Sequence, residues 1–231
     1  DTYRDAIKAG SGGSGIVIVK ATKAGGAVQI FKSSSTITVP IGATSMDFLV
    51  IAGGGAGGSN TGGGGGAGGT RMGAGFPVTE GQTFTVNVGS GGQRAGMPVS
   101  GITFGKGGSG SDSFVIVPGS PTSFIGSNGG GGGGIGDNHP SAAPDGDGLA
   151  GGCGGGAGNY HTNSVYGGTG NTPAITPVTG ETSPGVGQGG AGGGTRGPGG
   201  GPIGTIGVAQ GNASGGGGAS AAGSPGGDVG G

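Results

Sequence analysis

The chain has 231 residues, 75 of them glycine, and its 9 lysines and arginines nearly balance its 10 aspartates and glutamates, which gives a net charge of −1. Because these charges are scattered singly, they form no basic stripe of the kind that binds nucleic acid. The longest apolar run, residues 48–52, is far too short to cross a bilayer, so membrane insertion is not expected either.

The large apolar residues are few and unevenly distributed along the chain. Ile, Leu, Val and Phe together number 39, and 29 of them precede residue 126. The first half can therefore bury a small core, whereas the second half must offset a large loss of backbone freedom without much side-chain burial. Two alternatives remain for that half: a disordered glycine-rich chain, or a chain ordered by hydrogen bonds between backbones.

The N-terminal part of the chain contains three short strand patterns. Residues 14–20 form a compact β-branched run, and its continuous apolarity predicts a strand buried on both faces. A second pattern covers 27–31, and apolar residues alternate with threonine in a third over 35–39. Period-two alternation of this kind is typical of a strand with one buried face.

Four more strand patterns follow, at 46–52, within 76–88, at 102–104 and at 113–117. In the second of these, Phe84, Val86 and Val88 share one face of the predicted strand. No stretch has the periodicity of a long helix. The predicted fold is therefore all-β with almost no α-helix, built on a small antiparallel β-sandwich-like layer.

Glycine runs begin inside this apolar half and recur to the end of the chain, at 53–69, 129–134, 151–158, 189–201 and 215–218. They have no strict three-residue register, which excludes collagen. The extended three-residue helix known as polyglycine II remains, and its outward-pointing backbone groups require several helices packed side by side. We therefore expect the β-layer to continue into a packed bundle of polyglycine II helices.

These patterns divide the chain into three predicted parts. Residues 1–30 are an N-terminal segment, 31–125 a β-rich layer with a glycine-rich insert at 53–69, and 126–231 a polyglycine II region with exposed loops. Because the chain begins at Asp1 rather than Met, we expect it to be processed or to come from a longer polypeptide.

Two blocks of sequence resemble a known family. Residues 38–55, Thr-Val-Pro-Ile-Gly-Ala-Thr-Ser-Met-Asp-Phe-Leu-Val-Ile-Ala-Gly-Gly-Gly, and residues 77–92, Pro-Val-Thr-Glu-Gly-Gln-Thr-Phe-Thr-Val-Asn-Val-Gly-Ser-Gly-Gly, are similar to the glycine-rich domain of bacteriophage tail fibres and other surface proteins. The resemblance covers about 35–231. It implies a polyglycine II sandwich that carries variable loops, an extracellular, cell-surface or virion-surface location, and a host glycan or protein receptor as partner.

The chain departs from this family in the position of one strand. Such domains usually end in a strand of the type Ser-Gly-Ile-Val-Ile-Val, but here that strand stands near the start, with Ile16, Val17, Ile18 and Val19 at its centre. One alternative is a permuted strand that folds back into its own chain. The other is a strand donated to the open sheet edge of an identical subunit or a neighbouring fibre domain, which would build a head-to-tail filament.

Two polar and aromatic segments between glycine runs are candidate receptor-binding loops. One lies within 159–166 and holds two of the three tyrosines of the chain, and the other lies within 137–140. Tyrosine rings stack on flat apolar faces while amides adapt their hydrogen bonds, which suits recognition by loops on a rigid scaffold. The candidate residues are Asn138, His139, Asn159, Tyr160, His161, Asn163 and Tyr166.

The remaining motifs favour structural roles. Asp145 and Asp147 look like a fragment of a calcium loop, but no further carboxylate follows at the required spacing, which favours a polar turn. The two histidines are 22 residues apart with no nucleophile pattern nearby. Cys153 is the single cysteine and is expected to be a small residue within a glycine run. We therefore expect no cofactor, no metal and no enzymatic activity.

Overall fold

The computed structural model describes residues 9–22, 26–59, 62–94, 105–119, 124–136, 146–158, 165–170 and 185–187. These residues form strands and extended segments, and no helix among them is long and apolar enough to cross a membrane. The strand predicted at 102–104 lies outside the described residues, as do nearly all residues beyond 170.

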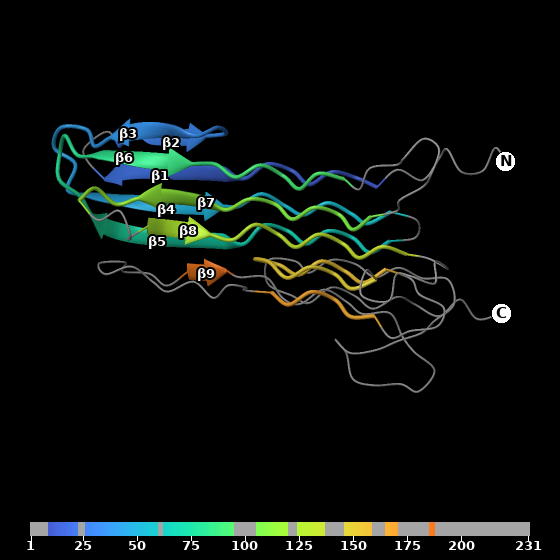
Figure 1. Cartoon of the computed structure of the whole chain (residues 1–231). Helices are drawn as coiled ribbons and strands as arrows, with labels where there is room; N and C mark the ends of the chain where they lie inside the picture. The colour runs from blue at the N-terminus through green and yellow to red at the C-terminus, as the bar shows by residue number, and fades with distance from the viewer. Residues whose placement is uncertain are drawn as a thin grey trace.

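The strands form two antiparallel sheets that face each other (Figure 1). The five-stranded sheet has the order β2-β1-β4-β5-β9, and the four-stranded sheet has the order β3-β6-β7-β8. The strands are β1 (Ile16–Thr22), β2 (Val28–Phe31), β3 (Ser35–Thr38), β4 (Ser45–Ile51), β5 (Thr70–Pro77), β6 (Thr83–Asn87), β7 (Ser113–Ile116), β8 (Phe124–Ser127) and β9 (Gly185–Gly187). The predicted all-β class and the sandwich-like layer are confirmed.

The strand β1 was predicted either to fold back into its own chain or to be donated to a neighbouring subunit. In the structure, β1 pairs within its own chain. Val17 lies opposite Phe31 of β2 on one side and opposite Val50 of β4 on the other. Both of its hydrogen-bonding edges are thus occupied by the same chain. The prediction of burial on both faces was wrong, because Val17 and Val19 are buried while Ile16 and Ile18 point to the outer face and are only partly covered.

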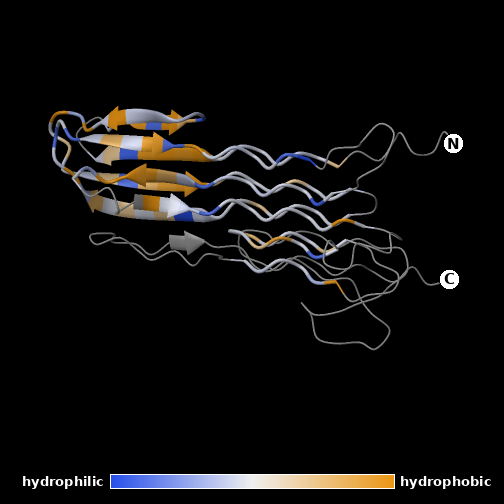
Figure 2. Cartoon of the chain, in the orientation of Figure 1, coloured by the Kyte–Doolittle hydropathy of each residue, from blue (hydrophilic) through white to orange (hydrophobic). Residues whose placement is uncertain are grey.

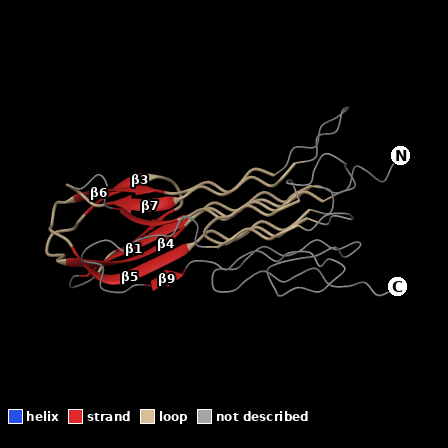
Figure 3. Cartoon of the chain, turned by 60° about the horizontal axis from the view of Figure 1, so that its bottom comes forward, coloured by secondary structure: helices blue, strands red, loops and turns tan. Residues whose placement is uncertain are grey.

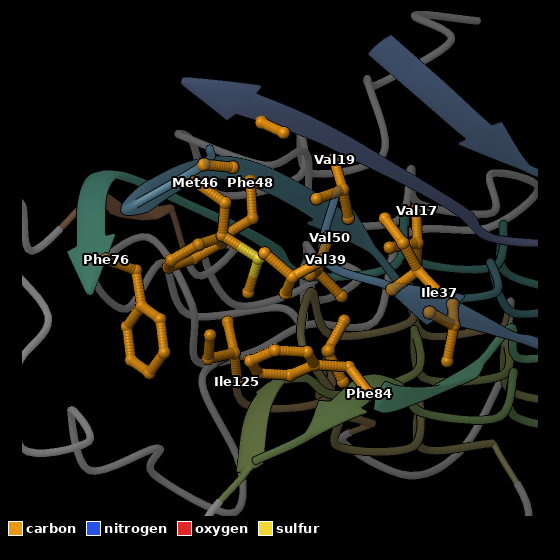
Figure 4. Packing of buried hydrophobic residues seen from close by; sticks show 14 residues of the cluster. Val17, Val19, Ile37, Val39, Met46, Phe48, Val50, Phe76, Phe84 and Ile125 are labelled. Atoms are coloured by element: carbon orange, nitrogen blue, oxygen red, sulfur yellow. The ribbon is translucent and has the colours of Figure 1, made fainter. Parts of the chain in front are cut away.

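The hydrophobic core fills the space between the two sheets (Figure 4). Phe76 of β5 lies between two other rings, with its centroid 6.4 Å from that of Phe48 and 6.5 Å from that of Phe84. Both contacts have the edge-to-face geometry that aromatic pairs favour. Each large side chain buried here stabilises the fold by about 1.5–3 kcal/mol, so the sandwich is held by ordinary side-chain packing.

The strand β5 was not predicted, because its pattern is hidden by small and charged residues. Gly73 faces the core where a Cβ would collide with the ring of Phe48, so a glycine is needed there. Arg71 in the same strand is fully buried, which reverses the usual association of arginine with the surface. β8 was missed as well, since only Phe124 and Ile125 mark it as apolar.

Extended glycine segments run on from one end of the sandwich, as Figure 3 shows from a second direction. In Figure 2 they contrast with the strands, since they carry few strongly hydrophobic residues. We call these segments together the glycine array. Its described members are 9–15, 52–59, 62–69, 88–94, 105–112, 128–136, 146–158 and 165–170. Members from both sides of residue 126 lie in one array.

Backbone hydrogen bonds join the members of the array with a period of three residues. Within 52–59, the N–H groups of residues 52, 55 and 58 donate to carbonyls of 62–69, those of 53, 56 and 59 donate to 105–111, and those of 54 and 57 donate to 9–15. Every third residue therefore faces the same neighbour. This is the pattern expected when an extended chain turns once per three residues.

Close packing explains why the interior members of the array are made of glycine. A Cβ added to Gly63, Gly66 or Gly133 would come within 3.0 Å of backbone atoms of the next segment. Real Cβ atoms do not approach backbone atoms so closely, and any larger residue would force the segments apart. Glycine is required at these positions for approach between backbones, and not for an unusual backbone angle.

Candidate functional site at the far end of the glycine array

The predicted loop at 137–140 and residues 159–164 of the predicted loop at 159–166 lie outside the described residues, but the structure describes the residues on both sides of segments 137–145 and 159–164. Gly136 ends the segment before the first loop, and its N–H donates to the carbonyl of Ser59 at 3.0 Å. Gly146 follows the first loop, and Gly158 precedes the second. The N–H of Gly158 donates to the carbonyl of Gly146 at 2.8 Å, so the bases of the two loops are adjacent.

Tyr166 is the one candidate receptor-binding residue that the structure describes, and its backbone is held on both sides. Its N–H donates to Oδ1 of Asp147 at 2.6 Å, and its carbonyl accepts the N–H of Gly148 at 2.8 Å. The side chain remains 43% exposed. The fixed backbone therefore presents a phenol ring to solvent at the end of the array away from the sheets.

Buried neighbours fix the position of Tyr166 further. Val165, the preceding residue, is fully buried against Ala157, and the two form a small apolar cluster within the array. Val165 lies inside while Tyr166 points outward. A ring whose backbone is held in this way loses less conformational entropy on binding than one on a flexible segment.

Asp147 has a role that the sequence did not reveal. The sequence pattern allows Asp147 to be part of a calcium loop or of a polar turn. In the structure, the carboxylate of Asp147 accepts the N–H of Tyr166. Among the described residues, no three His, Cys, Asp or Glu side chains group as metal ligands would. No sequence signal could have linked Asp147 to Tyr166, because the contact depends on which segments lie side by side.

Only Tyr166 among the predicted receptor-binding residues lies in the part of the chain that the structure describes. Asn138, His139, Asn159, Tyr160, His161 and Asn163 lie outside the described residues. The predicted assembly strand, Ile16, Val17, Ile18 and Val19, lies in the sandwich as part of β1.

Cys153 lies inside the array, as its glycine-rich surroundings predicted. Its side chain is fully buried, and Sγ is 4.0 Å from the carbonyl oxygen of Gly68. Burial raises the pKa of this thiol, an effect partly opposed by a hydrogen bond from the backbone of Ala67. The net effect of burial disfavours the thiolate form, and the fully buried Cys153 side chain serves packing.

Comparison with known protein families decides where this chain belongs. A glycine-rich domain family matches residues 30–231, which is most of the chain. The chain belongs to the glycine-rich domain family. Searches of curated proteins and of solved structures gave no match. The matched part of this glycine-rich domain begins after β1, yet β1 is paired on both sides in the five-stranded sheet.

Proposed function

We propose that this glycine-rich domain is a non-catalytic structural and adhesive module of an extracellular or virion fibre. In this proposal the sandwich is the base, the glycine array is a stiff projection, and loops at its far end bind a receptor on a host surface. A surface glycan is the expected class of ligand, because tyrosine rings stack on sugar faces while asparagine amides adapt to sugar hydroxyls.

One observation carries the proposal. The backbone bond between Gly158 and Gly146 holds the bases of two polar and aromatic loops together, and the bond between Tyr166 and Asp147 fixes a tyrosine beside them. Binding residues on loops supported by a rigid scaffold are a common arrangement. Although the two loops are separated in the sequence, this arrangement places them where both can contact one ligand.

The array supplies the rigidity in this proposal, and we propose that its members are polyglycine II helices. The three-residue period of the backbone hydrogen bonds supports this assignment. So does the close packing around Gly63, Gly66 and Gly133, which leaves no space for a side chain. A packed array of this kind resists bending because each member is bonded to several neighbours.

The test replaces Tyr166 by Ala and, separately, Tyr160 by Ala, and measures binding of the purified domain to host cells and to isolated surface polysaccharide. We expect the Tyr166→Ala variant to bind about 5- to 150-fold more weakly, the loss of about 1–3 kcal/mol that an aromatic stacking contact contributes. Only the side chain changes, so the backbone bonds of Tyr166 remain available.

The matched control is Ile41→Ala, because Ile41 is 83% exposed in the turn at the opposite end of the sandwich. That variant should bind as the unaltered domain does. Equal binding by all three variants, with unchanged unfolding temperatures, would contradict the loop assignment. Turnover of a surface glycan by the purified chain would contradict the non-catalytic reading.

A further inference from the structure

One side of the glycine array is open where the two sheets continue. In the sheets, β2 lies beyond β1 and β3 lies beyond β6. Among its described members, the array has no segment that continues β2 or β3. Residues 32–34 turn the chain directly from β2 into β3, and no glycine segment extends from this turn (Figure 1). Ser34 Oγ accepts the N–H of Val88 at 3.1 Å, which anchors this turn over the start of segment 88–94.

The step that results exposes one side of segment 9–15. We call this side the open ledge, and it consists of Gly10, Ser11, Gly13 and Ser14. All four residues are exposed. Their segment is nevertheless a regular member of the array, since the carbonyls of Gly10 and Gly13 accept the N–H groups of Gly57 and Gly54 at 3.1 and 2.9 Å.

The described part of the chain does not require glycine at Gly10 or Gly13. A Cβ on Gly12 would collide with the backbone of Gly54 and one on Gly15 with the carbonyl oxygen of Ile51, whereas a Cβ on Gly10 or Gly13 would meet nothing within 4 Å. Neither Gly10 nor Gly13 has the positive φ that would demand glycine, as Gly42 in its turn does. Because Gly10 and Gly13 are three residues apart and carry no side chains, the surface beside them has room for the backbone of another chain.

The ledge also presents unused hydrogen-bond donors. Within the part of the chain that the structure describes, the N–H groups of all four ledge residues donate to no partner. By contrast, Gly12 and Gly15 in the same segment donate to Gly92 and Gly89 at 2.9 Å each. An open row of donors on an extended backbone is a template for adding a further extended chain, as at the edge of a sheet.

These features restrict the partner. Backbones in the array approach so closely that a side chain would keep them apart, so the partner must offer an extended glycine segment. Among the described residues, the interior glycines are already packed, and the surface with glycine at the contact positions that a second copy can offer is the same ledge, at Gly10 and Gly13. Segment 9–15 carries no charged residue and the whole chain has a net charge of −1, so repulsion between copies is small.

We infer that the open ledge is a self-association surface through which two copies of this chain join their glycine arrays into one. The contact is isologous, with the same residues contributed by each copy, as in most symmetric dimers. It continues the backbone bonding of the array across the two molecules. It needs no exchange of β1, which stays in its own sheet, and it does not depend on receptor binding.

The experiment measures the mass of the full chain by sedimentation over a wide range of concentrations, and compares it with the double variant Gly10→Val and Gly13→Val. We expect reversible dimers of the unaltered chain. The double variant should raise the dimer dissociation constant by at least about tenfold, since several backbone hydrogen bonds between the copies are lost. Its monomer should unfold at the same temperature, because both Cβ atoms enter open space.

The control is Ala67→Val, which enlarges an exposed array residue outside the ledge and should leave dimerisation unchanged. Amide exchange supplies a second measurement, because the N–H groups of the ledge should become protected only at concentrations that favour the dimer. A chain that stays monomeric throughout, or a double variant that dimerises normally, overturns the inference. A monomer destabilised by the two valines also overturns it, since a segment of the same chain would then occupy the ledge.

Discussion

The sandwich and the glycine array are parts of one chain, and they are ordered by different forces. In the sandwich, side chains such as Phe76 and Phe84 are buried from water and pack against each other. Backbone hydrogen bonds there join neighbouring strands of the two sheets. In the array there is little side-chain surface to bury, and backbone groups bond directly to the backbones of several neighbours. The comparison shows that close approach of bare backbones can take the place of a hydrophobic core.

The largest effect should come from breaking the sandwich. Phe84→Ala removes a ring that is almost fully buried and leaves a cavity beside Phe76. We expect a loss of about 3–5 kcal/mol in the free energy of unfolding, measured by denaturant titration. Thr85→Ala, the exposed neighbour in β6, should cost far less. A small effect of Phe84→Ala would mean that the array alone sets the stability.

A smaller effect should come from breaking the array. Gly133→Val places a side chain against the backbone of Gly63, and we expect overpacking of this kind to cost about 1–3 kcal/mol. Gly13→Val is the matched control at concentrations at which the chain is monomeric, since the same substitution there enters open space.

Amide exchange locates the damage caused by Gly133→Val. In the unaltered chain, the bonded amides of 128–136 should exchange slowly although few side chains are buried around them. The variant should lose this protection in the array first and keep it in β4 and β6. Rapid exchange of 128–136 in the unaltered chain would instead support the disordered alternative for the glycine-rich half.

The smallest effect concerns the reactivity of Cys153, which reports how far water is excluded from the interior of the array. Because burial raises the pKa of the thiol, alkylation of the native chain should begin at higher pH than alkylation of the unfolded chain. The sign for stability follows. The neutral thiol is favoured in the fold, so its contribution is fully present below the pKa of the unfolded thiol and is lost as pH rises through the folded pKa. Equal alkylation rates in both states would show that water reaches the array.

Much of the sandwich could be predicted from the sequence, because strand patterns are local. The alternation of Ile37 and Val39, and of Phe84 and Val86, marks one buried face in each strand. The strand β5 escaped because Arg71 and Gly73 occupy its core-facing positions. Their fit depends on residues from other strands, such as the ring of Phe48 over Gly73, which no local pattern contains.

The strand patterns predict an all-β chain, the glycine content predicts order through backbone hydrogen bonds, and the setting of Cys153 predicts a packing residue. The pairing of β1 within its own chain, the hydrogen bond from Tyr166 to Asp147, and the open space beside Gly10 and Gly13 became visible in the folded chain. Local patterns could not predict these contacts, because glycine carries no side chain to specify a neighbour. For the segments that extend from strands, such as 9–15 before β1 and 52–59 after β4, the order of the strands in the sheets therefore sets which segments lie side by side.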